Sequence, residues 1–162
     1  MTTTADHLKQ MRDRRAGGGV RSVLIYLNGL TDHRFTAMYR FDTEQLRNLY
    51  FYDRERPEVE TCPDIPVLAS YCVFVRDSRH TFVTPDSVAD GRVGSHPKRL
   101  EVRSYCGVPL VDEAGRMFGT VCHFDTRPLP ISDENVSLME ALAPILAAGP
   151  AEPGAAADGP RL

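Results

Sequence analysis

The side chains with the greatest capacity for chemistry in this sequence are four cysteines: Cys62, Cys72, Cys106 and Cys122. A cysteine thiolate can attack an electrophile, bind a soft metal or form a disulfide. No two of them form a C-x-x-C motif, so the spacing argues against a structural zinc site. We expect Cys106 and Cys122 to act mainly as core residues, because cysteine is among the residue types most often buried.

Histidines are the second source of chemistry, at His7, His33, His80, His96 and His123. None lies four residues from another, so the sequence predicts no helical metal site. His96 falls in a long irregular segment, 87–101, where it either contacts a ligand or is an exposed loop residue. His123 stands beside Asp125. If His123 faces a pocket, it can donate to an anion or ligate haem, but we favour a buried histidine with satisfied polar groups.

Aromatic, acidic and thiol side chains supply the candidates for a small-molecule site. An apolar pocket with a few polar groups is the usual geometry of such sites. The predicted ligand-binding residues are Tyr39, Phe51, Asp53, Cys72, His96, Tyr105, Cys122, His123 and Asp125. The alternative is that the aromatic members are simply core residues.

The overall composition limits the classes of function. A chain of 162 residues, 42% hydrophobic and 25% charged, is expected to form one globular domain. Its formal net charge of -3 gives no basic excess for nucleic acid. No apolar run approaches the roughly 20 residues of a membrane span, and residues 1–15 lack the apolar core of a secretory signal. We therefore expect a cytoplasmic protein with reduced thiols and no membrane contact.

The periodicity of the first third of the chain predicts helices followed by a hairpin. Residues 4–15 read as a short polar helix, which the glycine-rich stretch 16–19 breaks or hinges. Helical spacing of apolar residues then predicts a second helix over 20–28. Alternating apolar and polar residues predict strands at 34–41 and 46–53, paired as a hairpin.

The middle of the chain is less regular. Proline and charge predict a loop over 54–66. Residues 67–77 fit either a strand or a helix, and we favour the helix. A short strand is predicted at 81–86, and the irregular segment 87–101 has a length that is often functional.

A second hairpin is predicted from 102–111 and 116–124 around the sequence DEAG. Its register is open. A four-residue loop places Tyr105 opposite Cys122 and puts Cys106 on the other face, whereas a three-residue loop places Cys106 directly opposite Cys122. A slip of one residue turns every side chain to the other face, so the two registers predict different sites.

The C-terminal part is predicted to be a helix followed by a tail. Ser132 is a good N-cap for a helix over 133–147, with acidic residues in its first turn. Pro144 should kink or end that helix. Residues 147–162 have the composition of a disordered tail.

The stretch YCGVPLVDEAGRMFGTVCHFD, followed by RPLPISDENVSLMEALA, resembles the GAF domain family. The family often shows G-x-P-L, a turn with glycine, and then G-T-L-C-x-x-D. The matching residues here are Gly107, Pro109, Leu110, Gly115, Gly119, Thr120, Cys122 and Asp125.

The resemblance implies an α+β, PAS-related fold with a central antiparallel sheet of five to six strands flanked by helices. The GAF domain would cover residues 20–148, preceded by a helix and glycine hinge at 1–19 and followed by a tail at 149–162. Family members bind cyclic nucleotides, bilins, haem or other small metabolites, and often dimerise through terminal helices. The cofactor, if any, stays unknown, and fold alone does not decide function.

One enzymatic group in the family, the free methionine-(R)-sulfoxide reductases, suggests a second interpretation. Two of its cysteines lie at places similar to Cys62 and Cys72, which become the alternative catalytic residues. Its attacking thiol usually lies in the loop that corresponds to 87–101, where this sequence has His96 but no cysteine. The reaction would then lack its usual nucleophile.

Three functions remain open from the sequence. The favoured one is a stand-alone sensory or regulatory domain that binds a small molecule and passes the signal to a protein partner. The others are a thiol-dependent reductase and a dimerisation module without a ligand. We expect a homodimer in any case, and in the last case helices 4–15 and 133–147 would form its interface.

Overall fold

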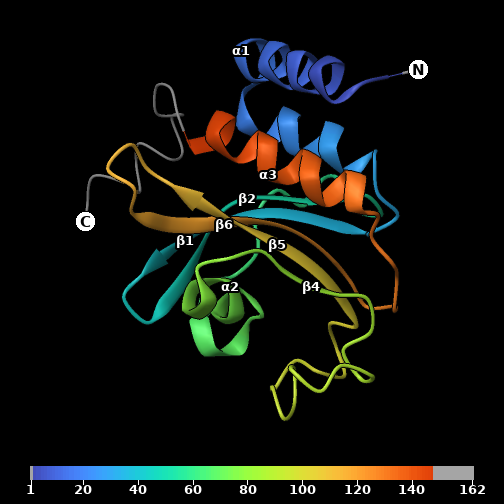
Figure 1. The fold of residues 1–162 in the computed structure, drawn as a ribbon, viewed down its shortest axis with the longest axis vertical. Helices are drawn as coiled ribbons and strands as arrows, with labels where there is room; N and C mark the ends of the chain where they lie inside the picture. Colours follow the sequence, from blue (N-terminus) through green and yellow to red (C-terminus); the bar gives the residue numbers. More distant parts are fainter. Residues whose placement is uncertain (1, 148–162) are drawn as a thin grey trace.

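Among residues 2–147, which the computed structural model describes, six strands form one antiparallel sheet in the order β3-β2-β1-β6-β5-β4 (Figure 1). The elements are α1 (Thr4–Asn28), β1 (Phe35–Asp42), β2 (Gln45–Asp53), β3 (Ile65–Pro66), the 3-10 helix η1 (Val67–Ala69), α2 (Cys72–Ser78), β4 (Phe82–Thr84), β5 (Ser104–Val111), β6 (Met117–Asp125) and α3 (Asp133–Ala147). The predicted α+β class, with a central antiparallel sheet flanked by helices, is confirmed. The predicted tail lies outside the described residues, apart from its first residue, Ala147.

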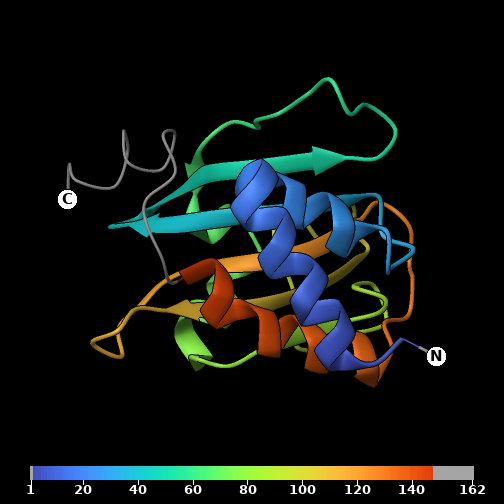
Figure 2. The ribbon, with the colours of Figure 1, turned by 90° about the horizontal axis from the view of Figure 1, so that it is seen from above.

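The sheet separates two hydrophobic cores. Helices α1 and α3 lie together on one face, and α2 lies on the opposite face (Figures 1 and 2). Side chains alternate between these faces along each strand. On β6, for example, Val121 packs with the helices α1 and α3, whereas Cys122 belongs to the core on the α2 side.

Helix α1 consists of two helical segments joined at a kink, so the prediction that residues 16–19 break or hinge the helix is confirmed. Gly19 has φ 77°, a conformation that favours glycine, and is the non-helical residue inside the run. The helix begins with a capping box, because Thr3 Oγ1 accepts from the backbone N–H of Asp6 at 3.1 Å and Asp6 accepts from the N–H of Thr3 at 2.9 Å. Met11 is fully buried in the helix-side core, so the segment before the kink packs on the same domain.

The two predicted hairpins are present, but the register of the second was not predicted. Val111 pairs with Met117, and a β-bulge then shifts the pairing, so that Gly107 lies opposite Cys122 and Cys106 lies opposite His123. The turn closes as in the three-residue alternative, with Asp112 bonded to Arg116, but an extra residue in β6 then moves the ladder, so neither predicted partner of Cys122 is correct. Cys106 and Cys122 lie on opposite faces of the sheet.

The remaining segments are mixed. The predicted loop at 54–66 ends in the two-residue strand β3, which pairs with the start of β2 and was not expected. The favoured helix at 67–77 is present as η1 and α2, joined by a short bend. The segment 87–101 is irregular, as predicted.

Helix α3 begins as the sequence predicts. Ser132 Oγ accepts from the backbone N–H of Asn135 at 3.1 Å. The helix continues through Pro144 to Ala147, so the proline does not end it. A proline this close to the C-terminus removes one helical hydrogen bond and leaves less than a turn beyond it. Within residues 2–147, no helix has both the length and the apolar character needed to cross a bilayer.

Candidate functional site

A cavity of about 280 Å³ opens on the α2 side of the sheet, and we call it the aromatic cavity. Six aromatic side chains line it: Phe35, Tyr39, Phe51, Tyr71, Tyr105 and Phe124. The ring of Phe35 stacks on that of Phe124 at a centroid distance of 4.9 Å and on that of Phe51 at 5.8 Å. These rings come from β1, β2 and β6, so the strand pairing itself builds the wall.

Three thiols lie at the floor of the aromatic cavity and form what we call the thiol cluster: Cys62, Cys72 and Cys122. Cys62 and Cys122 line the cavity, whereas Cys72 lies behind them and is fully buried. The hydroxyl of Tyr39 lies 3.3 Å from Cys62 Sγ, and that of Tyr105 donates to Cys72 Sγ at 3.2 Å. The cavity floor is therefore a layer of paired hydroxyls and sulfurs.

The three thiols differ in acidity. Burial raises the pKa of Cys62 and raises that of Cys122 well above its ordinary value. Burial also acts to raise the pKa of Cys72, but the hydrogen bonds around its sulfur outweigh burial and lower this pKa to about 7. The contributing side chains are Cys122, Ser70, Thr120 and Tyr105, of which the Tyr105 hydroxyl donates directly to the sulfur. A thiolate with several donors around it is stabilised in this way.

The rim of the aromatic cavity is held by a histidine. Within residues 87–101, which we call the lid segment, His96 Nε2 lies 3.1 Å from the carbonyl oxygen of Ser70 on the facing wall. The backbone N–H of Lys98 donates to His96 Nδ1 at 3.0 Å, so Nδ1 accepts, Nε2 carries the proton and the ring is neutral. Burial is the main reason that the pKa of His96 is lowered. Lys98 and Glu101 also line the cavity and form an ion pair at 2.8 Å.

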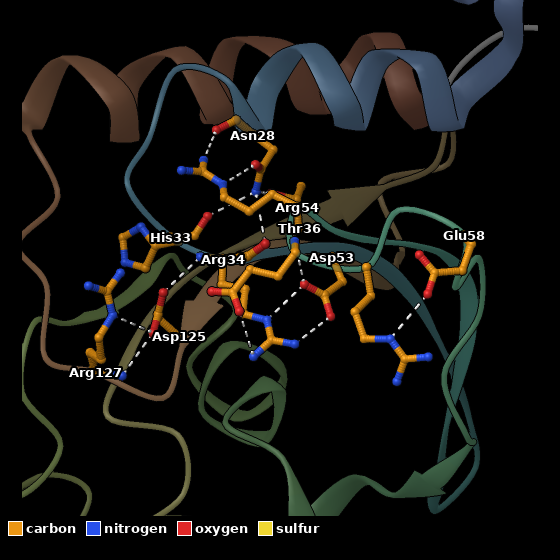
Figure 3. A network of polar contacts seen from close by, with 11 residues as sticks. Asn28, His33, Arg34, Thr36, Asp53, Arg54, Glu58, Asp125 and Arg127 are labelled. Carbon is orange, nitrogen blue, oxygen red and sulfur yellow. Dashed lines mark hydrogen bonds and ion pairs between the residues drawn. The ribbon is translucent and has the colours of Figure 1, made fainter.

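A separate polar network joins the ends of β1, β2 and β6 (Figure 3). The guanidinium of Arg34 donates to both carboxylate oxygens of Asp53, at 2.7 and 2.8 Å, and holds the pKa of Asp53 below its usual value. Asp125 accepts from the backbone N–H of Arg34 at 2.8 Å and from that of Arg127 at 2.9 Å. These contacts tie three strands together.

His123 belongs to the same end of the sheet but faces helix α1. Asn28 Nδ2 donates to Thr36 Oγ1 at 2.8 Å, which leaves the Thr36 hydroxyl to donate to His123 Nδ1 at 2.7 Å. The ring of His33 stacks on His123 at 5.9 Å. Burial lowers the pKa of His123 to about 3 and that of His33 to about 4, so both are neutral near pH 7.

Comparison with known proteins places the chain in a family. The model of the GAF domain matches residues 11–149. The chain belongs to the GAF domain family. No protein with a curated description matches the sequence of this GAF domain.

Solved structures share the GAF fold at low identity. The free methionine-R-sulfoxide reductase from Neisseria meningitidis, in complex with its substrate, is 20% identical with a TM-score of 0.70, over 89% of this chain and 86% of that one. The GAF domain of an Acinetobacter phosphoenolpyruvate-protein phosphotransferase is 13% identical with a TM-score of 0.71, over 88% and 89%. The phycoerythrobilin-bound GAF domain of a cyanobacterial phytochrome is 10% identical with a TM-score of 0.70, over 91% and 94%. At these identities the likeness concerns the fold.

The structure of this GAF domain brings some of the predicted site residues together and separates others. Tyr39, Phe51, Tyr105 and Cys122 line the aromatic cavity. Cys72 lies behind its floor, and His96 lies at its edge against the ring of Tyr71, at a centroid distance of 4.7 Å. Asp53, His123 and Asp125 do not line the cavity. Asp53 and Asp125 belong to the polar network instead, and His123 bonds to Thr36 on the other face of the sheet. Cys62, predicted only as an alternative catalytic residue, does line it.

Several cavity residues of the GAF domain were missed by reasoning from the sequence. Side chains alternate along a strand, so Phe35 lies on the same face of β1 as Tyr39, and Phe124 lies on the same face of β6 as Cys122. The alternation alone would have been sufficient to predict Phe35 and Phe124 as cavity residues. Lys98 and Glu101 gave no such signal, because they lie in irregular backbone. Within residues 2–147, no cluster of three or more histidine, cysteine or acidic side chains has an arrangement that would hold a metal ion.

Proposed function

We propose that this GAF domain binds a small organic molecule in the aromatic cavity and acts as a sensory or regulatory module. The observation that carries the proposal is the cavity itself, walled by six aromatic side chains, five from strands that are distant in sequence and one, Tyr71, from the N-cap of α2. Pockets for small ligands are concave and mostly apolar, with a few polar groups that fix orientation. The known ligand-binding members of the fold family support the same interpretation, including the bilin-bound domain described above.

The walls favour a ligand with an uncharged, planar body. Phe35 and Phe124 present stacked rings, and ring-to-ring packing is favourable at such separations. The volume of about 280 Å³ is at the small end of ligand pockets, which span about 300–1,000 Å³. A single or fused ring is therefore the class of ligand that we propose.

Charge argues against a phosphate-bearing ligand. Among the described residues that line the cavity, the cationic side chain is Lys98, and its ammonium group is already paired with Glu101. A phosphate would have to break that pair and would find no second cation beside it. A polar group at the rim, able to exchange bonds with Lys98 and Glu101 together, fits better.

The lid segment supplies a route for signalling. Lys98, Glu101 and Val102 line the cavity, and His96 fastens the segment to Ser70. A ligand that contacts both the floor and this rim would favour the closed arrangement, and the populations of lid conformations would shift accordingly. The signal would then pass to a partner protein that binds the lid segment, or the surface beside it, in its ligand-bound conformation.

The direct test combines native mass spectrometry of the purified protein with thermal unfolding in the presence of indole, adenine and phenol as probes. At a hundredfold excess over Kd, a bound probe should raise Tm by about 5–10 °C. Ala69→Phe places a ring in the cavity and should abolish the shift, because Ala69 lines it. Leu68→Phe is the matched control, since Leu68 is exposed and does not line the cavity. Equal ligand-induced rises in Tm in the two variants would show that the probe does not bind in the cavity.

A second candidate is a thiol-dependent free methionine-(R)-sulfoxide reductase. It is supported by the position of Cys62 and Cys72 around one cavity and by the substrate-bound Neisseria structure. The absence of a cysteine from the lid segment weighs against it. Consumption of free methionine-R-sulfoxide with dithiothreitol, lost in Cys72→Ser, would establish the enzyme; no consumption at any thiol concentration would exclude it.

Homodimerisation and a cytoplasmic location complete the proposal as predictions. The helices α1 and α3 pack against each other and offer the surface for a second copy. Light scattering, before and after deletion of residues 1–19, would test the dimer. A monomer at all concentrations would exclude it.

A further inference from the structure

The sulfur of Cys72 is surrounded by more polar groups than a cysteine needs if it only packs in the core. Its sulfur accepts a hydrogen bond from the hydroxyl of Tyr105 at 3.2 Å and lies 3.2 Å from the hydroxyl of Thr120. The Tyr105 hydroxyl lies directly over Gly107, the residue paired with Cys122, and both cysteines belong to the same buried core, so Cys122 is a neighbour of Cys72. A neutral cysteine in a core needs no such set of donors, because it behaves as a small apolar side chain. Donors that surround one sulfur stabilise its thiolate.

The neighbouring thiol has the opposite character. Burial, together with the neighbouring sulfur of Cys72, raises the pKa of Cys122 well above its ordinary value. Cys122 also lines the aromatic cavity, so a small molecule in the cavity reaches the pair from that side. The Cys72 sulfur is therefore the nucleophile of the pair, and Cys122 is a protonated thiol next to it.

We propose that Cys72 and Cys122 form a redox-active dithiol at the floor of the aromatic cavity, which a hydroperoxide converts to an intramolecular disulfide. The inference does not depend on the ligand proposed above, because it uses the cavity only as the path by which peroxide enters. The pair consists of residues from α2 and β6, so the disulfide would join the helix to the sheet.

The chemistry balances without a further reactant. The Cys72 thiolate attacks one peroxide oxygen, the O–O bond breaks, and the departing oxygen takes a proton to leave as water or an alcohol. The sulfur of Cys122 then attacks the sulfenic acid on Cys72, the S–O bond breaks, and hydroxide leaves with the Cys122 proton as water. Two thiols are oxidised, one peroxide is reduced, and a disulfide remains.

The other two cysteines, Cys106 and Cys62, serve as controls for the environment of Cys72. Cys106 lies on the helix side of the sheet, where its thiol contacts Met139 Sδ at 3.7 Å and burial raises its pKa to about 12. Cys62 lines the same cavity, but its recorded hydrogen bonds join its sulfur to Tyr39 and its backbone N–H to Asn48. Neither has the donors that surround Cys72.

The test is treatment of the full chain with hydrogen peroxide, followed by alkylation, digestion and non-reducing peptide mapping. We expect loss of two hydrogen masses and a peptide that links Cys72 to Cys122. Cys106→Ser and Cys62→Ser should form the same link. Cys122→Ser should instead accumulate a Cys72 sulfenic acid that dimedone traps.

A further variant tests the role of Tyr105 as a positioning residue. Tyr105→Phe keeps the ring and removes the hydroxyl donor, so oxidation at neutral pH should slow by about tenfold and its pH midpoint should rise. A merely structural role would leave the pH midpoint unchanged. A disulfide between Cys62 and Cys72, a dominant product at Cys106, or four unreacted thiols after peroxide treatment would each overturn the proposal.

Discussion

Gly119 on β6 lies so close to the carbonyl oxygen of Tyr39 on β1 that a Cβ atom at position 119 would collide with it. The obstacle is backbone, which cannot rotate away as the end of a flexible side chain can. Tyr39 lines the aromatic cavity, so the same close approach fixes the position of its floor relative to the neighbouring strand.

Gly119→Ala should therefore lower the free energy of unfolding by about 2–4 kcal/mol, because the two strands must separate to admit a methyl group. Urea denaturation followed by circular dichroism measures this. Gly17→Ala is the matched control, since nothing lies within 4 Å of its Cβ position inside α1. That change should be neutral or stabilise by up to about 1 kcal/mol. Equal effects at both positions would contradict the interpretation.

The glycine at 119 illustrates what the sequence could reveal about the fold. Its place in the motif G-T-x-C indicated the family, and the family supplied the sheet and the helices. The alternation over residues 34–53 predicted the first hairpin without any family knowledge. The second hairpin was predicted as an element, but its register was not, because one extra residue in β6 is invisible to a count of loop lengths.

The site was harder to predict than the fold for a related reason. The face on which His123 lies depends on that register, and the structure turns it toward Thr36 and away from the cavity. The environment of Cys72 depends on Thr120, which is 48 positions away in the chain. Contacts of this kind arise from tertiary packing, which local patterns do not encode.

The ion pair between Arg34 and Asp53 should contribute more than any exposed pair. Both carboxylate oxygens are engaged and Asp53 is buried, so Asp53→Asn removes a charge and leaves the guanidinium with only the longer ion pair to the exposed Glu55, at 3.5 Å. We expect a loss of about 1–3 kcal/mol in the free energy of unfolding. Asp13→Asn breaks the exposed pair with Lys9 and should cost less than about 0.5 kcal/mol. Similar losses of unfolding free energy in the two variants, measured by chemical denaturation, would contradict the prediction that the Arg34–Asp53 pair contributes more than the exposed Lys9–Asp13 pair.

His33 and His123 should make the protein less stable in mild acid. Their folded pKa values, about 4 and about 3, lie below the ordinary value of 6.5, so between these limits the unfolded state binds protons that the folded state does not. Stability is then unaffected above pH 6.5 and falls as the pH drops, by about 1.4 kcal/mol per pH unit for each histidine.

The measurement is the free energy of unfolding between pH 7 and pH 5, above the range in which the carboxylates titrate. His123→Gln should flatten this dependence, whatever its effect on stability at pH 7. His80→Gln, at an exposed position, should leave the slope unchanged. A slope that His123→Gln does not alter would assign the acid sensitivity to other groups.

His96 should couple the lid segment to pH through its two hydrogen bonds. In the neutral ring, Nδ1 accepts from the N–H of Lys98, and protonation turns Nδ1 into a donor that faces another donor. The charged groups near the ring include Lys98, which also disfavours the proton, while Tyr71 and Phe74 offer uncharged rings. Because the pKa of His96 is lowered, the bond from the Lys98 N–H is intact above pH 6.5 and is lost only as the pH falls below it, whereas the bond from Nε2–H to Ser70 persists in the protonated ring.

Hydrogen exchange read by mass spectrometry, corrected for intrinsic rates, tests this fastening. Peptides covering residues 93–102 should exchange faster in acid than at neutral pH, beyond the correction. His96→Ala should exchange fast at both pH values, because the bond to Ser70 is absent in each. His80→Ala should behave as the unmodified chain. If the His96 variant retains slow exchange at neutral pH, the bond between Tyr71 and the carbonyl oxygen of Val102, at 2.8 Å, is sufficient to hold the lid segment.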